Sequence, residues 1–378
     1  MKSMSNNEAL RQPEFPPPPC ADLDWNGLDF SVRNVNGHIE SHYTVASGKW
    51  TEPKLVKNRM LNVDGLAVGL HYGQQVFEGM KANRAPSGQI NIFRVESHAS
   101  RLNHSCETVS IPPPPYEHFY QCVCLAVAEN AVYVPPHDAN ACLYIRPLIF
   151  GSGPQINNLP SLEYTFCVFV QPIPSLYGLA PLDAVILEHF DRAAPMGTGS
   201  AKVGGNYAPI FKWQREAKNN GFGLLLHLDS KTRTAIDEFS TSSFVGVKNS
   251  DGATTLISPD SASVMKGVTS KSVFSLAEHF GWNVEIRPVR YEELEDFDEV
   301  MACGTAAGVA SIKSITCLSD DRKFQYEKGG EDDYKCRERM TSALQNIQRG
   351  LVPDDFEWCT IVLPPEIYYR SCARGLRT

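Results

Sequence analysis

The sequence has no long apolar run, no dense cluster of positive charge and no cysteines at metal-ligand spacing. No run approaches the roughly 18 apolar residues that a transmembrane helix needs, which argues against a spanning helix. Lysine and arginine number 35 against 43 aspartates and glutamates, so the net charge of -8 disfavours nucleic acid or an anionic membrane as principal partner. The 11 cysteines are scattered, as buried or idle thiols in a reducing compartment would be, and predict no metal site. Small molecules are the expected partners, and the expected location is cytoplasmic, with a mitochondrial one left open.

The chain is long enough for two domains, since 378 residues with 42% hydrophobic content are many for one core. Residues 1–24, which include a run of four prolines, are expected to form a disordered tail. Residues 171–181 hold three prolines and a glycine between two strand-like runs, which predicts an interdomain linker. The predicted division is therefore a small N-terminal domain over residues 25–170 and a large C-terminal domain over residues 182–378.

The hydrophobic pattern predicts a mixed α/β (α+β) fold, with helices and strands in both halves. Helical patterns cover residues 96–108, 116–131, 208–218, 267–280 and 334–349. Strand patterns, either alternating or continuous and rich in β-branched and aromatic residues, cover residues 28–33, 90–94, 142–150, 164–170, 185–190, 223–228, 233–240, 255–257 and 300–304. The residues beyond 351 carry no pattern that predicts an element.

One lysine lies in a stretch of small residues, Gly197–Tyr207, which contains four glycines. A phosphate-binding P-loop needs Gly-Lys-Ser/Thr, whereas here Ala201 precedes Lys202 and Val203 follows it. A dinucleotide-binding fingerprint would need a third glycine where Lys202 stands. Two interpretations remain on the local pattern, a solvated lysine in a surface turn and a lysine placed as a nucleophile.

Two further segments are suited to binding an anion. Gly267–Ser270 opens a predicted helix, whose free N–H groups and hydroxyls suit a phosphate, although simple capping explains them equally well. The strand that ends at Gly304 runs into small residues, where backbone N–H groups can converge on an oxyanion. In the strand over residues 233–240, alternation places Asp237 and Glu238 on opposite faces, so one of these carboxylates is expected to point inward.

These segments, together with three others, resemble the branched-chain amino-acid aminotransferases, which belong to the fold-type IV pyridoxal-phosphate enzymes. The matching motifs occur in the family's order and are Leu70-His71-Tyr72-Gly73, Phe77-Glu78-Gly79, Tyr144-Ile145-Arg146-Pro147, Lys202-Val203-Gly204-Gly205-Asn206-Tyr207, Gly267-Val268-Thr269 and Gly304-Thr305-Ala306. The match covers about residues 30–350. It implies a two-domain α/β protein, a homodimer or larger assembly, with the cofactor pyridoxal 5'-phosphate held between the domains.

The resemblance also implies a role for each matching residue. Lys202 corresponds to the lysine that forms the Schiff base. Arg101 corresponds to the arginine on the cofactor phosphate, Tyr207 to the tyrosine beside the phenolic oxygen, and Glu238 to the carboxylate on the pyridine nitrogen. The other expected cofactor contacts are Gly267, Val268, Thr269, Gly304 and Thr305. The expected substrate-binding residues are Tyr72, Phe77, Tyr144, Arg146, Thr305 and Ala306.

The chemistry accounts for these residue types independently of the family. A lysine forms an imine with an aldehyde, and the amine that a substrate frees can move a proton between the substrate Cα and the cofactor. Glu238 would keep the pyridine nitrogen protonated, so that the ring withdraws electrons from the reacting carbon. Gly204 and Gly205 are interpreted as clearance for the cofactor ring and the packing near it.

The predicted activity is reversible transamination between a hydrophobic, branched-chain L-amino acid and 2-oxoglutarate, giving the 2-oxo acid and L-glutamate, as in branched-chain amino-acid biosynthesis. Ser243 stands where the family usually has Asn, and Ser270 where a basic residue is common. These departures leave open an enzyme of specialised metabolism that acts on another hydrophobic 2-oxo acid. The rival functions are a D-amino-acid or (R)-amine transaminase, a lyase and a non-catalytic relative.

Overall fold

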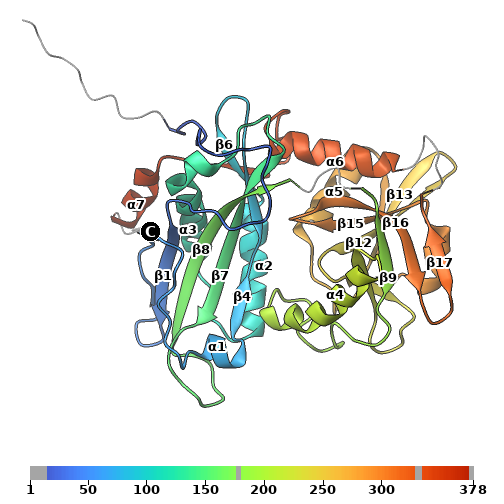
Figure 1. The fold of residues 1–378 in the computed structure, drawn as a ribbon, viewed down its shortest axis with the longest axis horizontal. Helices are drawn as coiled ribbons and strands as arrows, with labels where there is room; N and C mark the ends of the chain where they lie inside the picture. The colour runs from blue at the N-terminus through green and yellow to red at the C-terminus, as the bar shows by residue number, and fades with distance from the viewer. Residues whose placement is uncertain (1–14, 176–179, 328–333, 374–378) are drawn as a thin grey trace, which may run out of the picture.

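The structure is a computed structural model that describes residues 15–175, 180–327 and 334–373. Two sheets stand side by side, and each has its own hydrophobic core and covering helices (Figure 1). This mixed α/β architecture confirms the predicted fold class. No helix in the described ranges is long and apolar enough to cross a membrane.

The first sheet is antiparallel and is built mainly from the N-terminal half of the chain. Its strands are β1 (His38–Thr44), β2 (Lys49–Trp50), β3 (Lys54–Val56), β4 (Gln75–Phe77), β5 (Met80–Arg84), β6 (Ile90–Phe93), β7 (Ala141–Gly151), β8 (Glu163–Pro174) and β18 (Cys359–Ile361). The long strands β7 and β8 pair from Ala141 opposite Pro174 to Gly151 opposite Tyr164. Their β-branched and aromatic residues suit a pleated, buried surface, so they form the centre of this sheet.

Helices cover the first sheet on the side of its core. They are α1 (Val68–Tyr72), α2 (Val95–Thr108), α3 (Tyr116–Glu129) and α7 (Pro365–Ala373). Because α3 is apolar over most of its surface, it buries a continuous set of side chains, Phe119 and Leu125 among them. The core that results joins α2 and α3 to the inner face of β7 and β8.

The second sheet is mixed, since β9 runs parallel to both β10 and β16. Its strands are β9 (Leu182–Ile186), β10 (Leu224–Leu228), β11 (Ile236–Phe239), β12 (Ser243–Ser250), β13 (Ala253–Pro259), β14 (Asn283–Arg287), β15 (Glu299–Gly304), β16 (Gly308–Cys317) and β17 (Arg322–Gln325). The helices of this half are α4 (Phe211–Asn219), α5 (Val268–His279) and α6 (Lys335–Gln348). α5 and α6 bury Val273 and Leu344 in a shared core against this sheet.

Most of the predicted elements are confirmed, and the strand predicted at residues 28–33 is wrong. The helices predicted at residues 96–108 and 116–131 correspond closely to α2 and α3, and those predicted at residues 267–280 and 334–349 to α5 and α6. Residues 28–33 form no strand, and β1 begins only at His38. An alternating pattern makes a strand only where a neighbouring strand accepts its hydrogen bonds.

The predicted tail and linker differ from the structure at their described residues. Phe15 packs against the first core, and the Cys20 N–H donates to the Val132 carbonyl at 2.7 Å, so the disordered-tail prediction is wrong from Phe15 onward. Residues 1–14 lie outside the described residues. The first residues of the predicted linker belong to β8, which continues to Pro174, and residues 176–179 lie outside the described residues.

The C-terminal end of the chain returns to the first sheet. β18 pairs with β6, with Cys359 opposite Phe93, and α7 lies beside α3 (Figure 1). The Gln121 side chain donates to the Tyr368 carbonyl at 2.7 Å and so fixes α7 to α3. The sequence-based boundary put these residues in the large domain, and we propose instead that the small domain contains residues 359–373.

Candidate functional site

A cavity of about 600 Å³ opens between the two sheets. It collects thirteen of the fourteen predicted site residues, namely Phe77, Arg101, Tyr144, Arg146, Lys202, Tyr207, Glu238, Gly267, Val268, Thr269, Gly304, Thr305 and Ala306. In the described residues no group of three or more histidine, cysteine, aspartate or glutamate side chains is placed to hold a metal ion. The cavity brings together the lysine, its neighbours and the two segments that the sequence predicts to bind an anion.

The backbone of Lys202 is hydrogen-bonded to β4 and α2, both in the first half of the protein. Its carbonyl accepts a hydrogen bond from the Phe77 N–H at 3.1 Å, and its N–H donates to the Ser105 hydroxyl at 2.8 Å. The side chain then enters the cavity, where Nζ lies 2.9 Å from the Tyr207 hydroxyl. Burial lowers the pKa of Lys202 from 10.5 to about 8, with Glu78 opposing that change. With a pKa of about 8, roughly a tenth of the amine is neutral, and thus nucleophilic, at pH 7.

The two glycines after the lysine differ in their surroundings. A Cβ at Gly204, which lines the cavity, would come within 2.7 Å of the Gln75 amide nitrogen. A Cβ at Gly205 would meet no atom within 4 Å, and Gly205 is not among the lining residues. The interpretation of these glycines as clearance is therefore compatible with the position of Gly204, whereas Gly205 faces open space.

Glu238 is the carboxylate of β11 that lines the cavity. Burial raises the pKa of Glu238 to about 7, and the opposing effect of Arg192, with which it forms an ion pair, is not enough to cancel that rise. The neighbouring Asp237 is also buried but does not line the cavity, as strand alternation predicts. Sequence patterns did not identify Arg192 as a site residue, because only the packing of distant segments brings it to Glu238.

The start of α5, which the sequence predicts to bind an anion, lies at the cavity with its N-terminus uncapped by a side chain. Gly267 is the N-cap residue, no side chain caps the helix there, and Val268 and Thr269 line the cavity. Ser270, one of the departures from the family pattern, donates its hydroxyl to the Gly267 carbonyl at 3.0 Å and lies 3.4 Å from the Ser243 hydroxyl. Unpaired N–H groups at a helix start attract phosphate, so this surface fits a phosphate group.

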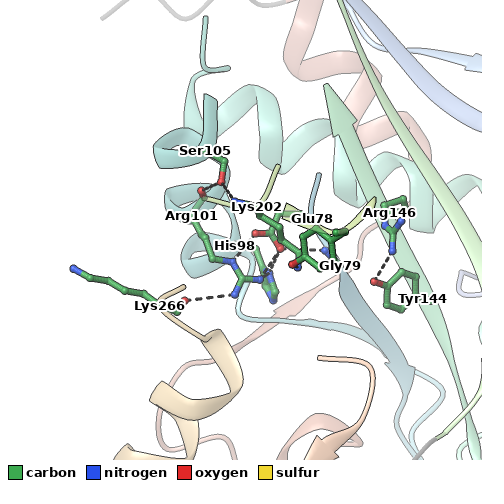
Figure 2. Close-up of polar contacts among 10 residues, drawn as sticks. Glu78, Gly79, His98, Arg101, Ser105, Tyr144, Arg146, Lys202 and Lys266 are labelled. Carbon is green, nitrogen blue, oxygen red and sulfur yellow. Dashed lines mark hydrogen bonds and ion pairs between the residues drawn. The ribbon is translucent and has the colours of Figure 1, made fainter. Parts of the chain in front are cut away.

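Arg101 reaches the same surface from α2 and is held by a carboxylate that the sequence did not single out (Figure 2). Its Nε and Nη2 donate to Glu78 at 2.6 and 2.8 Å, and its Nη1 lies 3.5 Å from the Lys266 carbonyl. Burial alone would raise the pKa of Glu78, but Arg101 and His98 outweigh it and hold that pKa well below its ordinary value. The Phe77-Glu78-Gly79 motif was the available signal, though it did not show which partner Glu78 would meet.

The opposite wall of the cavity combines a cation with apolar groups. Arg146 donates to the Tyr144 hydroxyl at 3.0 Å (Figure 2), and its guanidinium lies 5.0 Å from the centre of the Phe77 ring. Leu148 and Phe211 also line the cavity. The guanidinium can bind a carboxylate, and the apolar groups beside it can pack against an aliphatic side chain.

Small residues at and just after the end of β15 line the cavity close to the start of α5. Gly304, Thr305 and Ala306 line it as predicted, and the buried Lys81 of β5 donates to the Ala306 carbonyl at 3.0 Å. This contact joins the first sheet to the turn, so Lys81 is a further site-supporting residue that sequence patterns did not reveal.

Tyr72 is the predicted site residue that the structure does not bring to the cavity. It lies on α1, its side chain is 52% exposed, and its hydroxyl donates to the Ile156 carbonyl at 2.7 Å. Tyr72 is absent from the lining within this chain. Its predicted place in the side-chain pocket is therefore wrong for the single chain, because α1 turns its aromatic residue toward the surface.

The lining residues fit a cofactor that carries an aldehyde, an aromatic nitrogen and a phosphate. Lys202 offers an amine with a lowered pKa, Glu238 offers a buried carboxylate, and the start of α5 with Arg101 offers an anion site. These three features line one cavity, which is the arrangement that a single bound pyridoxal phosphate requires.

Comparison with known proteins agrees with this geometry. Residues 75–315 match the model of the family described as amino-transferase class IV. The aminotransferase poxL of Penicillium oxalicum is 53% identical over 356 residues, which cover 94% of this chain and 97% of that protein. The branched-chain amino acid aminotransferase gloG of Glarea lozoyensis is 44% identical and covers 93% of this chain and 99% of its own length.

Solved structures of low sequence identity share the fold. The branched-chain amino acid aminotransferase of Escherichia coli superimposes with a TM-score of 0.70 at 24% identity, covering 87% of this chain and 100% of that chain. The branched-chain amino acid aminotransferase of Thermobaculum terrenum, solved in its PLP-form, gives 0.69 at 21% identity, covering 88% and 100%. The cavity, the family model and the relatives agree, and the chain therefore belongs to the class IV aminotransferases, which depend on pyridoxal phosphate.

Proposed function

We propose that this aminotransferase transfers the amino group of a hydrophobic, branched-chain L-amino acid to 2-oxoglutarate, giving the 2-oxo acid and L-glutamate, and that it also runs in reverse. The observation that carries the proposal is the mixed wall formed by Arg146 and Phe77, whose cation and ring lie 5.0 Å apart. An aliphatic side chain would pack on the ring, and the side-chain carboxylate of glutamate would bind the guanidinium. The relative named a branched-chain amino acid aminotransferase supports the same substrate class.

The substrate's own carboxylate would bind on the other side of the cavity. Thr305 and Ala306 follow a strand end and offer backbone N–H groups there, and Lys81 holds this turn through the Ala306 carbonyl. A substrate fixed at both ends would present its Cα to Lys202, whose side chain lines the same cavity. Orientation of this kind is a large part of what an active site contributes to rate.

Pyridoxal phosphate, when bound, supplies an aldehyde and an electron-withdrawing ring. We assign its phosphate to Arg101 and the start of α5, and its ring nitrogen to Glu238. Arg192 favours the ionised form of Glu238, which can then hold a proton on that nitrogen. Burial raises the pKa of Tyr207 to about 12, so its hydroxyl stays protonated near neutral pH and can donate a hydrogen bond.

Lys202 is the residue we assign to proton transfer. Its Nζ lies 2.9 Å from the Tyr207 hydroxyl and 4.7 Å from the centre of the Phe77 ring, so it sits beside the wall that we assign to the substrate side chain. Burial lowers the pKa of Lys202 to about 8, so the amine can accept a proton from the substrate Cα. In the reverse reaction, the protonated amine can return a proton to that carbon.

We also infer that the protein is a homodimer, as the family resemblance implies. Exposed apolar side chains on and near α1 support this inference, since Leu70 is 65% exposed and Ile156 is 69% exposed. Light scattering on the purified protein would give the mass directly, and a monomer at micromolar concentration would contradict it. The cytoplasmic location stays a prediction, which imaging of the tagged full chain would test.

A substrate panel tests the proposed activity. The purified protein, loaded with pyridoxal phosphate and given 2-oxoglutarate, should use leucine, isoleucine or valine at least about tenfold faster than alanine, since a few methylenes in an apolar pocket are worth that much. D-alanine and 1-phenylethylamine test for the rival transaminase activities. Transfer from only these last two would overturn the proposal, while a preference for another hydrophobic amino acid would favour an enzyme of specialised metabolism.

A further inference from the structure

Glu78 is the charged residue of the Phe77-Glu78-Gly79 motif, and the proposed mechanism gives it no role. It lies in the turn between β4 and β5, and its side chain is completely buried. A buried carboxylate is costly unless donors surround it. Its oxygens accept bonds from Arg101 Nε and Nη2 at 2.6 and 2.8 Å, from the His98 ring at 2.8 Å and from the Gly79 N–H at 3.1 Å.

The geometry of this pair fixes the arginine as well as the carboxylate. Two parallel N–H···O bonds join one edge of the guanidinium to Glu78, which restrains both the position and the plane of the group. The third nitrogen, Nη1, then points to the segment just before α5, where it donates to the Lys266 carbonyl at 3.5 Å (Figure 2). Arg101 can thus use one remaining edge for a ligand at the start of α5.

The same helix connects Arg101 to the lysine. The Ser105 hydroxyl donates to the Arg101 carbonyl at 2.9 Å and accepts a hydrogen bond from the Lys202 N–H at 2.8 Å (Figure 2). These bonds fix the distance between Arg101 and the Lys202 backbone through α2. A ligand that extends from the start of α5 to Lys202 would therefore meet both residues at a fixed separation. Glu78 sets the direction of the Arg101 guanidinium.

We propose that Glu78 is a positioning residue that orients Arg101 toward the cofactor phosphate and so makes the site selective for pyridoxal phosphate over pyridoxal. The proposal rests on the assignment of Arg101 to the phosphate made above. Orientation and charge act in opposite directions here, since the Glu78 carboxylate also repels a phosphate. If orientation dominates, removing the charge of Glu78 weakens phosphate binding, and if repulsion dominates, the same change strengthens it.

Binding of the two cofactor forms to the apoprotein tests the proposal. Glu78→Gln keeps the shape of the side chain and removes its charge, and Glu107→Gln, at an exposed position of α2, is the matched control. Absorbance titration should show pyridoxal phosphate bound about tenfold more weakly by E78Q, which is the size expected for a lost charge-assisted hydrogen bond. Pyridoxal binding should change less than about twofold by the same principle, and E107Q should match the wild type for both.

A second variant keeps the test valid if E78Q folds poorly. The double variant Glu78→Gln with Arg101→Gln removes both charges of the buried pair, so neither charge is left without the other. If Glu78 acts through Arg101, this double variant and Arg101→Gln alone should bind pyridoxal phosphate equally. Tighter binding by E78Q, an equal loss for both cofactor forms, or an added loss in the double variant would each overturn the proposal. Leucine turnover by the wild type is measured separately, so a failure of the proposed function is recognised independently.

Discussion

Arg192 forms a buried ion pair with Glu238, and the side chain of each residue is 5% exposed. The same guanidinium donates to the Ser263 carbonyl at 2.7 Å and the Gly199 carbonyl at 3.2 Å. Gly199 belongs to the lysine stretch, and Ser263 to the segment that leads into α5. Arg192 therefore connects the carboxylate, the lysine stretch and the segment before α5 through one side chain.

Arg192→Gln is expected to lower kcat/KM for leucine at least about tenfold at pH 7.5, by loss of a buried charge partner. Burial already raises the pKa of Glu238 to about 7, and Arg192 opposes that rise. Without Arg192 the carboxyl stays protonated to higher pH, so activity should recover as pH increases from 7 to 9. The pH profile of kcat/KM measures this displacement.

The exposed Arg215 of α4 provides the matched control for this experiment. Arg215→Gln removes the same charge from the same half of the protein, and its profile should overlie that of the wild type. An unshifted profile in Arg192→Gln would show that the ion pair does not control the ionisation of Glu238.

Arg146→Gln should separate the two substrates of the proposed reaction. The guanidinium is expected to bind the side-chain carboxylate of glutamate and 2-oxoglutarate, whereas leucine has no such group. The KM for 2-oxoglutarate should therefore rise about tenfold or more, as for a lost charged hydrogen bond, while the KM for leucine changes little. Steady-state kinetics with each substrate varied in turn give the two values, and an equal rise in both would contradict the assignment.

The position of Lys202 could be predicted because local rules are strict there. Its stretch excluded the common phosphate-loop motifs, and the order of the six motifs then fixed the family. Several helices could also be predicted from periodicity, since apolar residues at helical spacing are typical of a helix that buries one face. Predictions of this kind need only residues that are neighbours in the sequence.

The ion pairs could not be predicted, because they depend on tertiary packing. Glu78 and Arg101 lie 23 positions apart, and nothing local to either residue identifies the other. The pairing of β18 with β6 likewise could not be predicted, because it depends on an edge strand that exists only once the first sheet has formed. Tyr72 shows the converse case, where a family motif is present but the chain turns the side chain outward.

Attachment of pyridoxal phosphate to the apoprotein should depend on pH with a midpoint near 8. Burial lowers the pKa of Lys202 from 10.5 to about 8, and only the neutral amine attacks an aldehyde. The rate should therefore rise with pH and level off above about 9, well below the range in which an ordinary lysine is half deprotonated. Stopped-flow absorbance of the lysine imine measures the rate of attachment. Lys202→Ala should show no imine absorbance at any pH. A midpoint near 10 would contradict the lowered pKa.

Gly267 is surrounded closely enough that an added methyl group should displace the start of α5. A Cβ there would overlap the hydroxyl oxygens of both Ser243 and Ser270. These are two of the positions that depart from the family pattern, and their hydroxyls meet at the helix start that we propose for the phosphate. We therefore expect these two departures to affect how the cofactor is held.

Gly267→Ala should weaken binding of pyridoxal phosphate about tenfold, since overpacking of this kind typically costs about 1–3 kcal/mol. Adding Ser243→Ala and Ser270→Ala removes both hydroxyls and should restore most of the affinity, because the overlap disappears with them. Gly205→Ala is the control, since a Cβ there meets no atom within 4 Å and should leave the affinity unchanged. Titration of each apoprotein gives the dissociation constants. A loss in Gly267→Ala that the serine replacements do not relieve would show that the helix start is displaced by something other than these two hydroxyls.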